Sequence, residues 1–472
     1  MLAGAAVAAA ALARLFALLA RPLWFDEIFT AWAARMPWPR LLDVLRLDSG
    51  PPLFYVLERP VAAIGGRLGA PDTLLRALSF VAAAALFLAA RTLPDASARR
   101  RFLVLTAASP LLLVYAAEAR PYALLSALGM ALFLLSLAAP ERLPRLALAA
   151  LLSAAALFTH YLAILLVASL AAVALARGRR RSAAALLLGA AFFLPWVPVL
   201  AHQPGEAIAW MRETAPSSAA AMLSAAGGAG RVPDPFGGPL PGWLLWAGAG
   251  VGCVALAGAT TSRSGASPAR DAALVTVLTL SGALFLSLLR RPVAFPGRTE
   301  LAVLPIWLWG LAAATSTSRL ARVASVAVAA VGALSCGALL SRVPRENPPY
   351  VEAAAKLGRE AGPKDVAIVG GAFYLPARLA SDRGLLASRL VALPEELAAH
   401  PGWIPARLPG PRDLDGLERE LTLLPPQSRA FVLVPPLFDN AGLRAVLSGG
   451  GKVRSLDAGP GALLLVRESA SP

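Results

Sequence analysis

Carboxylates, arginines and a histidine lie at the ends of long apolar segments of this chain. A carboxylate can take a proton from a hydroxyl group, and a guanidinium binds phosphate through its planar fork of donors. Ionisable side chains at membrane depth are costly and usually face a cavity or one another. The residues of these types are Asp26, Glu27, Asp48, Glu118, Arg120, His160 and Arg298.

The segments between these residues are long and apolar enough to cross a membrane. The chain has 472 residues, of which 57% are hydrophobic and 15% are charged, whereas about a quarter of the residues of a soluble protein are charged. A spanning helix needs about 20 apolar residues. We therefore predict a polytopic α-helical membrane protein with about 11 transmembrane helices, at 2–20, 73–93, 102–117, 121–139, 145–158, 161–176, 182–200, 243–260, 272–290, 300–316 and 322–341.

The distribution of arginine predicts the orientation of the chain. With the N-terminus in the cytoplasm, the inside loops are "RTLPDASARRR", "PERLPR", "RGRRR", "TSRSGASPAR" and "STSRLAR", and each contains arginine, as the positive-inside rule requires. The first outer loop, residues 21–72, also contains six arginines and departs from the rule. This orientation places all of the ionisable residues named above at the outer face, where we expect a single hydrated site.

The parts outside the predicted spans differ in character. Residues 1–341 form the predicted transmembrane domain, whose outer loop 21–72 carries amphipathic segments that we expect to lie as helices in the membrane interface. Residues 201–242 are rich in Gly, Pro and Ala, which predicts a mobile outer loop or lid. Residues 342–472 contain "DVAIVGG", "RAFVLVPP" and "GALLLVRE", which are typical of buried strands. This part is predicted to be a small soluble α/β domain outside the cytoplasm.

Charge and cysteine content exclude other classes of protein. The formal net charge of +16 comes mostly from arginine in short loops, and the chain contains only three lysines, so we expect no nucleic-acid partner. Cys253 and Cys336 each lie alone within an apolar run, which predicts neither a disulfide framework nor a cysteine metal site.

Four short motifs occur in order along the chain: "LWFDE", "DSGPPLFY", "EARPYALL" and "THYLA". With them, residues 20 to 310 resemble the bacterial glycosyltransferase family related to protein O-mannosyltransferases and to the aminoarabinose transferase of lipid A, which has the GT-C fold. The resemblance implies transfer of a sugar from a polyprenyl-phosphate donor to a hydroxyl of a glycan, lipid or protein acceptor. It also implies that the reaction takes place at the outer face of the cytoplasmic (inner) membrane of a bacterium.

The resemblance also implies roles for individual residues. It assigns the catalytic base to Asp26. Glu27 and Asp48 are further catalytic candidates because of their charge and their position at the same face. The expected substrate-binding residues are Tyr55, Glu118, Arg120, His160 and Arg298. The segment "PGRTELAVLPIW" keeps the arginine of the family pattern but has Thr299 where the family often has tyrosine. An in-line displacement at the sugar would invert its anomeric carbon, and Mg²⁺ or Mn²⁺ could be bound by the oxygen ligands of Asp26, Asp48 and Glu118.

Each of these residues also has a purely structural interpretation. Acids are favourable near the start of a helix, Glu118 and Arg120 could simply pair, His160 could bond to backbone, and Tyr55 could belong to an interfacial aromatic belt. The alternative function is a transporter or flippase of lipid-linked sugars. We find none of the internal repeats that are common in transporters, and the charges gather at one face instead of the bilayer midplane. The sequence does not identify the sugar or the acceptor.

Overall fold

The chain forms two compact units. The computed structural model describes residues 16–137, 141–203, 215–232, 240–260, 267–289, 293–402, 407–449 and 451–468. The first unit, called the helical unit below, comprises Met1–Arg21, Ser49–His202 and Ile208–Pro344. The second, called the sheet unit, comprises Pro22–Asp48, Gln203–Ala207 and Arg345–Pro472.

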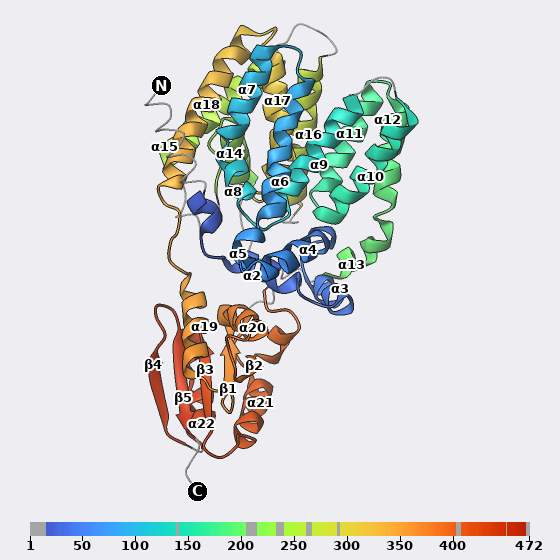
Figure 1. Cartoon of the computed structure of the whole chain (residues 1–472). Helices are drawn as coiled ribbons and strands as arrows, with labels where there is room; N and C mark the ends of the chain where they lie inside the picture. Colours follow the sequence, from blue (N-terminus) through green and yellow to red (C-terminus); the bar gives the residue numbers. More distant parts are fainter. Residues whose placement is uncertain are drawn as a thin grey trace. The chain divides into compact units, whose positions relative to one another are not determined.

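The helical unit is a bundle of mostly apolar helices (Figure 1). Its α-helices are α4 (Leu53–Arg67), α5 (Pro71–Leu74), α6 (Ala77–Leu86), α7 (Ala96–Ala107), α8 (Pro110–Ala116), α9 (Tyr122–Leu137), α10 (Leu143–Thr159), α11 (Ala163–Ala176), α12 (Arg180–Ala191), α13 (Val197–His202), α14 (Ala215–Ala226), α15 (Gly242–Thr260), α16 (Pro268–Leu288), α17 (Leu304–Ala314) and α18 (Arg319–Leu340). Short 3-10 helices are η1 (Phe87–Thr92), η2 (Leu194–Trp196) and η4 (Thr299–Ala302).

The helices confirm a polytopic membrane fold. Among the described residues, five helical stretches are long and apolar enough to cross a membrane: Pro71–Thr92, Arg180–His202, Gly242–Thr260, Pro268–Leu288 and Arg319–Leu340. Four shorter apolar helices lie at other predicted spans. The span predicted at 102–117 is two helices, because Ser109 caps the start of α8 and Pro110 follows it. The total of about eleven spans remains a prediction, and most of the first one (1–15) lies outside the described residues.

The prediction of a mobile loop at 201–242 is wrong for residues 215–226. These residues form α14, which packs on α15. The contact is close because both helices carry small residues: a Cβ atom built on Gly252 would lie 2.2 Å from the carbonyl oxygen of Leu223. Small residues let helix backbones approach in this way within membranes. Residues 204–214 and 233–239, to which the lid prediction also applied, lie outside the described residues.

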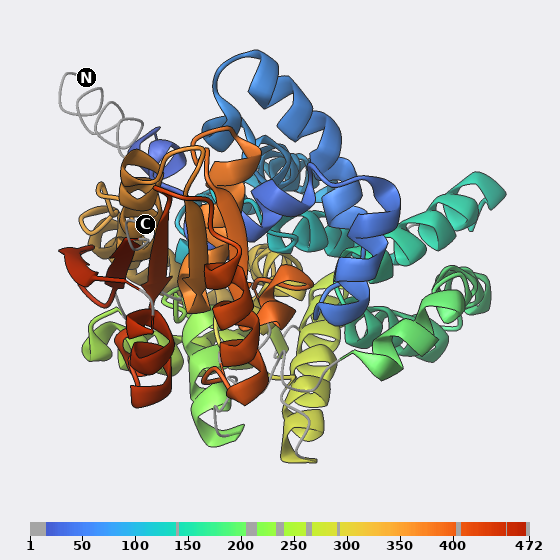
Figure 2. The same ribbon diagram turned by 90° about the horizontal axis from the view of Figure 1, so that it is seen from below.

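The sheet unit contains an α/β domain that confirms the predicted class. In its described residues the strand order is β2 (Arg389–Leu393), β1 (Val366–Gly370), β3 (Arg429–Val434), β5 (Leu463–Glu468) and β4 (Val453–Asp457). The first three strands are parallel, and β5 and β4 are antiparallel to their neighbours. One face packs on α19 (Pro349–Glu360) and α20 (Tyr374–Asp382), and the other on α21 (Pro411–Thr422) and α22 (Ala441–Ser448). Figures 1 and 2 show these layers from two directions.

Two helices from near the N-terminus belong to the sheet unit. They are α2 (Phe25–Ala33) and α3 (Trp38–Leu47). The backbone N–H of Phe25 donates to the Tyr350 hydroxyl at 2.9 Å, and the two rings pack edge to face. Helices were predicted within 21–72, and their place in the membrane interface remains a prediction.

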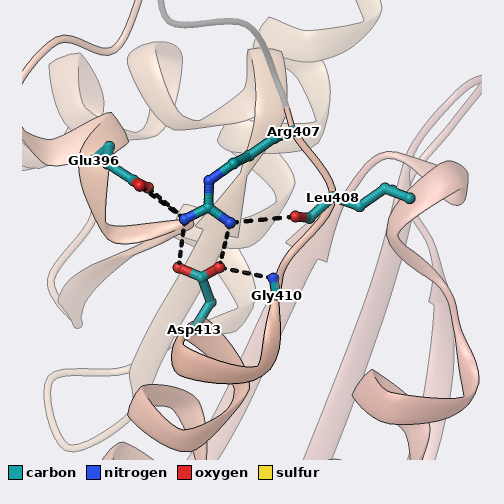
Figure 3. A network of polar contacts seen from close by, with 5 residues as sticks. All are labelled: Glu396, Arg407, Leu408, Gly410 and Asp413. Atoms are coloured by element: carbon teal, nitrogen blue, oxygen red, sulfur yellow. Dashed lines mark hydrogen bonds and ion pairs between the residues drawn. The ribbon is translucent and has the colours of Figure 1, made fainter.

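An ion-pair network fixes the segment that follows β2. Arg407 donates to Glu396 at 2.7 Å and to Asp413 at 2.6 Å, as Figure 3 shows. Glu396 lies in the 3-10 helix η6 (Glu395–Ala398), and Asp413 lies in the first turn of α21. The guanidinium of Arg407 therefore ties η6 to α21.

Candidate functional site

The predicted site residues divide between the two units. Tyr55, Glu118, Arg120, His160 and Arg298 belong to the helical unit, whereas Asp26, Glu27 and Asp48 belong to the sheet unit. The charged residues among them are all buried. Each group is described here within its own unit.

Arg120 is held at the turn between α8 and α9. Its backbone N–H donates to the Glu118 carbonyl at 2.8 Å, and its own carbonyl accepts from the Ser79 hydroxyl at 3.1 Å. Its side chain reaches α4, where Nη1 lies 3.5 Å from the Tyr55 hydroxyl. The motifs "EARPY" and "PPLFY" are therefore brought together, with two of the five predicted binding residues in contact.

Arg298 is presented by a tight turn that precedes η4. Gly297 adopts a φ of 87°, a conformation that favours glycine, and its N–H donates to Glu300 Oε2 at 2.8 Å. The Thr299 hydroxyl accepts from the N–H of Phe295 at 2.8 Å. Thr299, which departs from the family pattern, therefore closes the turn that carries Arg298.

Aromatic rings join Arg298 to His160. The Arg298 guanidinium lies 5.5 Å from the ring centre of Tyr122 and 4.9 Å from that of Phe295, within the range of cation–π attraction. The Tyr122 ring also packs at 5.1 Å from His160 and at 4.8 Å from Tyr115. We call Tyr55, Tyr115, Glu118, Arg120, Tyr122, His160 and Arg298 the arginine–tyrosine cluster.

The surroundings of His160 keep its imidazole uncharged. It lies in the short loop between α10 and α11, where its Nδ1 accepts from the backbone N–H of Leu162 at 3.1 Å. Burial lowers the pKa of His160 to about 3, and Arg120 and Arg298 act in the same direction. The imidazole is therefore neutral at physiological pH, so the ionisable groups of the cluster besides its tyrosines are two guanidiniums and the carboxyl group of Glu118.

The adjacent acids of the sheet unit stand in the first turn of α2. Glu27 Oε2 accepts a hydrogen bond from the backbone N–H of Trp24 at 3.4 Å. An acid at this position of the first turn caps the start of the helix. Asp26 and Glu27 are both buried. The structural interpretation of Glu27 is therefore supported, and the catalytic role of Asp26 remains a prediction.

Asp48 has a neighbour that the sequence did not suggest. It ends α3, and its Oδ1 lies 3.7 Å from Nε2 of His400, which is fully buried against the ring of Phe29. His400 was not among the predicted site residues, and neither were Tyr115 and Glu300. Only the position of Glu300, two residues after Arg298, offered a signal.

Within the part of the chain that the structure describes, no group of three His, Cys, Asp or Glu side chains is placed to hold a metal ion. The divalent cation therefore remains a prediction from ligand chemistry alone.

The helical unit also contains an apolar cavity of about 210 Å³. Its walls come from α14, α15, α16 and α17, and include Met222, Leu256, Leu280 and Trp307. Such walls suit an aliphatic chain.

Comparison with solved structures identifies the fold. ArnT from Cupriavidus metallidurans in the apo state matches with a TM-score of 0.60 at 14% identity, over 98% of this chain and 96% of that one. The same protein bound to undecaprenyl phosphate matches with a TM-score of 0.60 at 12% identity, over 98% and 97%. The mycobacterial arabinofuranosyltransferase AftD matches at 17% identity over 95% and 40%, with a TM-score of 0.41. No family model and no curated protein sequence matches the chain. The predicted fold class is confirmed.

Proposed function

We propose that the chain is a membrane glycosyltransferase that moves a sugar from a polyprenyl-phosphate donor to an acceptor hydroxyl at the outer face of a bacterial cytoplasmic membrane. The arginine–tyrosine cluster carries this proposal, because the charges of both Arg120 and Arg298 act on a neutral His160 and the Arg298 guanidinium lies over the Tyr122 ring, against the single carboxyl group of Glu118. The fold adds support. ArnT is the lipid A aminoarabinose transferase, and one of its structures holds undecaprenyl phosphate.

The proposed chemistry needs few groups. The acceptor oxygen bonds to the anomeric carbon, the bond from that carbon to the phosphate oxygen breaks, and the hydroxyl proton passes to a base. Negative charge develops on the departing phosphate, where fixed positive groups stabilise the transition state. We assign that role to Arg120 and Arg298. Attack opposite the leaving group inverts the anomeric carbon.

The remaining roles rest on the motif resemblance. Asp26 is proposed as the base that takes the acceptor proton, and Glu118 and Tyr55 are proposed to orient Arg120 or a sugar hydroxyl. The apolar cavity beside Trp307 is proposed to take part of the polyprenyl chain. These assignments leave the sugar and the acceptor undefined.

The decisive experiment is radiolabel transfer from a panel of polyprenyl-phosphate sugars, with membranes that carry the wild type, Asp26→Asn or Asp43→Asn. Asp43 is the matched control, because it is an exposed acid of α3 that pairs with Arg46 at 3.0 Å. Transfer from one donor that is lost only in Asp26→Asn, at equal expression, would support the reaction and the base.

Two other results would contradict different parts of the proposal. Transfer that survives in Asp26→Asn would keep the reaction class and remove Asp26 as the base. No transfer from any donor, in membranes supplied with candidate acceptors, would contradict the proposal and favour a transporter of lipid-linked sugars.

A further inference from the structure

The sheet unit contains a cleft to which the proposed transfer assigns no role. Its volume is about 500 Å³, within the usual range of pockets for small ligands. One wall is the turn between α2 and α3, and the other is formed by α20 and η6. The lining residues that matter here are Trp32, Arg35, Arg40, Tyr374, Arg378 and Asp382.

The charge of the cleft is predominantly positive. Three of its side chains are guanidiniums and one is a carboxylate. Arg378 and Asp382 lie one helical turn apart on α20, with Nε 3.2 Å from Oδ1. Arg35, Arg40 and Arg378 are exposed, so an incoming anion can reach the guanidiniums from solvent.

Tyr374 adds a hydroxyl donor to the lining of the cleft. The residue is buried, and Arg378, Asp382 and Arg40 are its charged neighbours. Burial raises the pKa of Tyr374, and the positive charges of Arg378 and Arg40 offset this rise only in part. The hydroxyl therefore stays protonated at neutral pH and can donate a hydrogen bond to an anion.

The walls of the cleft are held in place by contacts at its rim. Arg40 Nη2 donates to the carbonyl oxygen of Ala398 in η6 at 2.8 Å, across a sequence separation of 358 residues. The other side of η6 is tied to α21 by the Arg407 network (Figure 3). Binding groups held on fixed elements lose less freedom when a ligand binds.

We propose that this cleft binds a phosphate-bearing ligand, with Arg35, Arg40 and Arg378 as the anion-binding groups and Tyr374 as a further donor. Guanidinium forks match phosphate geometry, and the buried Trp32 provides an apolar wall for the body of the ligand. The volume accommodates a phosphate together with a group of the size of a sugar. A soluble phosphomonoester and a lipid headgroup share this chemistry.

The test is calorimetric titration of the full chain in phosphatidylcholine nanodiscs. The probes are glucose 1-phosphate, glucose and the short-chain lipid dihexanoyl phosphatidic acid. The wild type should bind a phosphate probe and not glucose. The inference rests on the sheet unit alone and the assay requires no transfer activity. Because Arg120 and Arg298 are also proposed to bind phosphate, the cleft variants below separate binding in this cleft from binding at the arginine–tyrosine cluster.

Two variants of the cleft have opposite expected effects. Arg378→Gln should raise the Kd of the phosphate probe about tenfold or more, because it removes a charge-assisted hydrogen bond. Asp382→Asn should lower the Kd severalfold, because it removes the negative charge beside the site. A misfolded variant cannot bind more tightly than the wild type. Tighter binding by Asp382→Asn would therefore show that weaker binding by Arg378→Gln is not simply a loss of the folded cleft.

Arg444→Gln is the matched control. Arg444 lies on α22, outside the cleft, and its Nε pairs with Asp439 Oδ1 at 2.6 Å, with exposed fractions of 49% and 29% against 44% and 31% for Arg378 and Asp382. The Kd of the phosphate probe for Arg444→Gln should equal that for the wild type.

Binding of glucose 1-phosphate alone identifies a soluble ligand, and binding of the lipid probe alone identifies a headgroup. Failure of both phosphate probes at millimolar concentration, or equal Kd values for Arg378→Gln and Arg444→Gln, would overturn the proposal.

Discussion

Arg298 is a buried charged residue with closely packed surroundings in the helical unit. Its guanidinium lies beside the rings of Tyr122 and Phe295, and the Gly297 turn fixes its backbone. A planar cation stacked in this way presents its edge to an oxyanion. Substitutions of Arg298 can therefore separate the contribution of its positive charge from that of its planar fork of donors.

We predict that Arg298→Gln lowers kcat/KM for transfer by roughly 10²–10³, the usual effect of losing one preorganised donor to a developing negative charge. Arg298→Lys keeps the charge but loses the fork, and should fall between this variant and the wild type. Both are measured with the donor identified in the radiolabel assay. Arg319→Gln, at the exposed start of α18, is the control, and a Gln variant within twofold of the wild type would remove Arg298 from the site.

His400 predicts a dependence of stability on pH. Burial lowers the pKa of His400 to about 4, against about 6.5 for an unfolded chain. Between these values the unfolded chain binds a proton that the folded chain does not. The stabilisation is therefore complete above pH 6.5 and decreases as the pH falls towards 4, by about 3 kcal/mol at most.

Amide hydrogen exchange of residues 389–402 at several pH values, corrected for intrinsic rates, measures this effect. Protection should decline between pH 6.5 and 4 in the wild type, and His400→Leu should show a flatter profile. Identical profiles in the two proteins would show that another group titrates.

Single residues were predictable from the sequence where the signal was local. Charge at the end of an apolar run was enough to select Arg120 and Arg298 as candidates, and the structure buries both. The contact between Asp48 and His400 joins residues 352 positions apart, and a lone histidine in "AAHPG" carries no periodic pattern. Tyr115 was missed for a related reason, because a tyrosine within an apolar run is indistinguishable from a packing residue.

At the scale of elements, burial decided which strands could be predicted. The central strands β1, β3 and β5 are continuous apolar runs, and the sequence indicated all three. The edge strands β2 and β4 are partly exposed and mix charged with apolar residues, as in "VRSLD", so neither pattern stands out. The helix α14 was missed because its Ala and Ser residues pack closely without producing strong hydropathy.

The packing of α14 on α15 can be tested with two glycines of the same helix. A Cβ atom at Gly252 would lie 2.2 Å from the Leu223 carbonyl oxygen, whereas one at Gly250 would meet nothing within 4 Å. Gly252→Val should therefore force the helices apart and destabilise the helical unit by about 1–3 kcal/mol or more. Thermal unfolding in detergent measures the change.

Gly250→Val is the matched control, since it adds the same side chain to α15 on a face without neighbours. Its unfolding temperature should stay close to that of the wild type. Equal losses in the two variants would indicate an effect of valine on the helix itself and would contradict the packing argument.

At the scale of the whole molecule, the chain leaves and re-enters its units in a way that the sequence did not indicate. Residues 22–48 were predicted as part of an outer loop of the transmembrane domain, and the structure groups them with residues after 344. Hydropathy identifies apolar segments but not their partners. The contacts of Phe25 with Tyr350, and of Arg40 with Ala398, join segments more than 300 residues apart.

This division predicts which segments lose protection together. Phe431 is fully buried at the centre of the sheet, and Phe431→Ala should destabilise the sheet unit by about 3–5 kcal/mol. Because α2 packs on α20 within the same unit, hydrogen exchange of residues 25–47 in the full chain should accelerate along with that of β1 and β3. Phe133→Ala, an equally buried change in the core of the helical unit, should leave the exchange of residues 25–47 unchanged. Faster exchange of residues 25–47 in Phe133→Ala but not in Phe431→Ala would contradict this division and would assign α2 and α3 to the transmembrane domain.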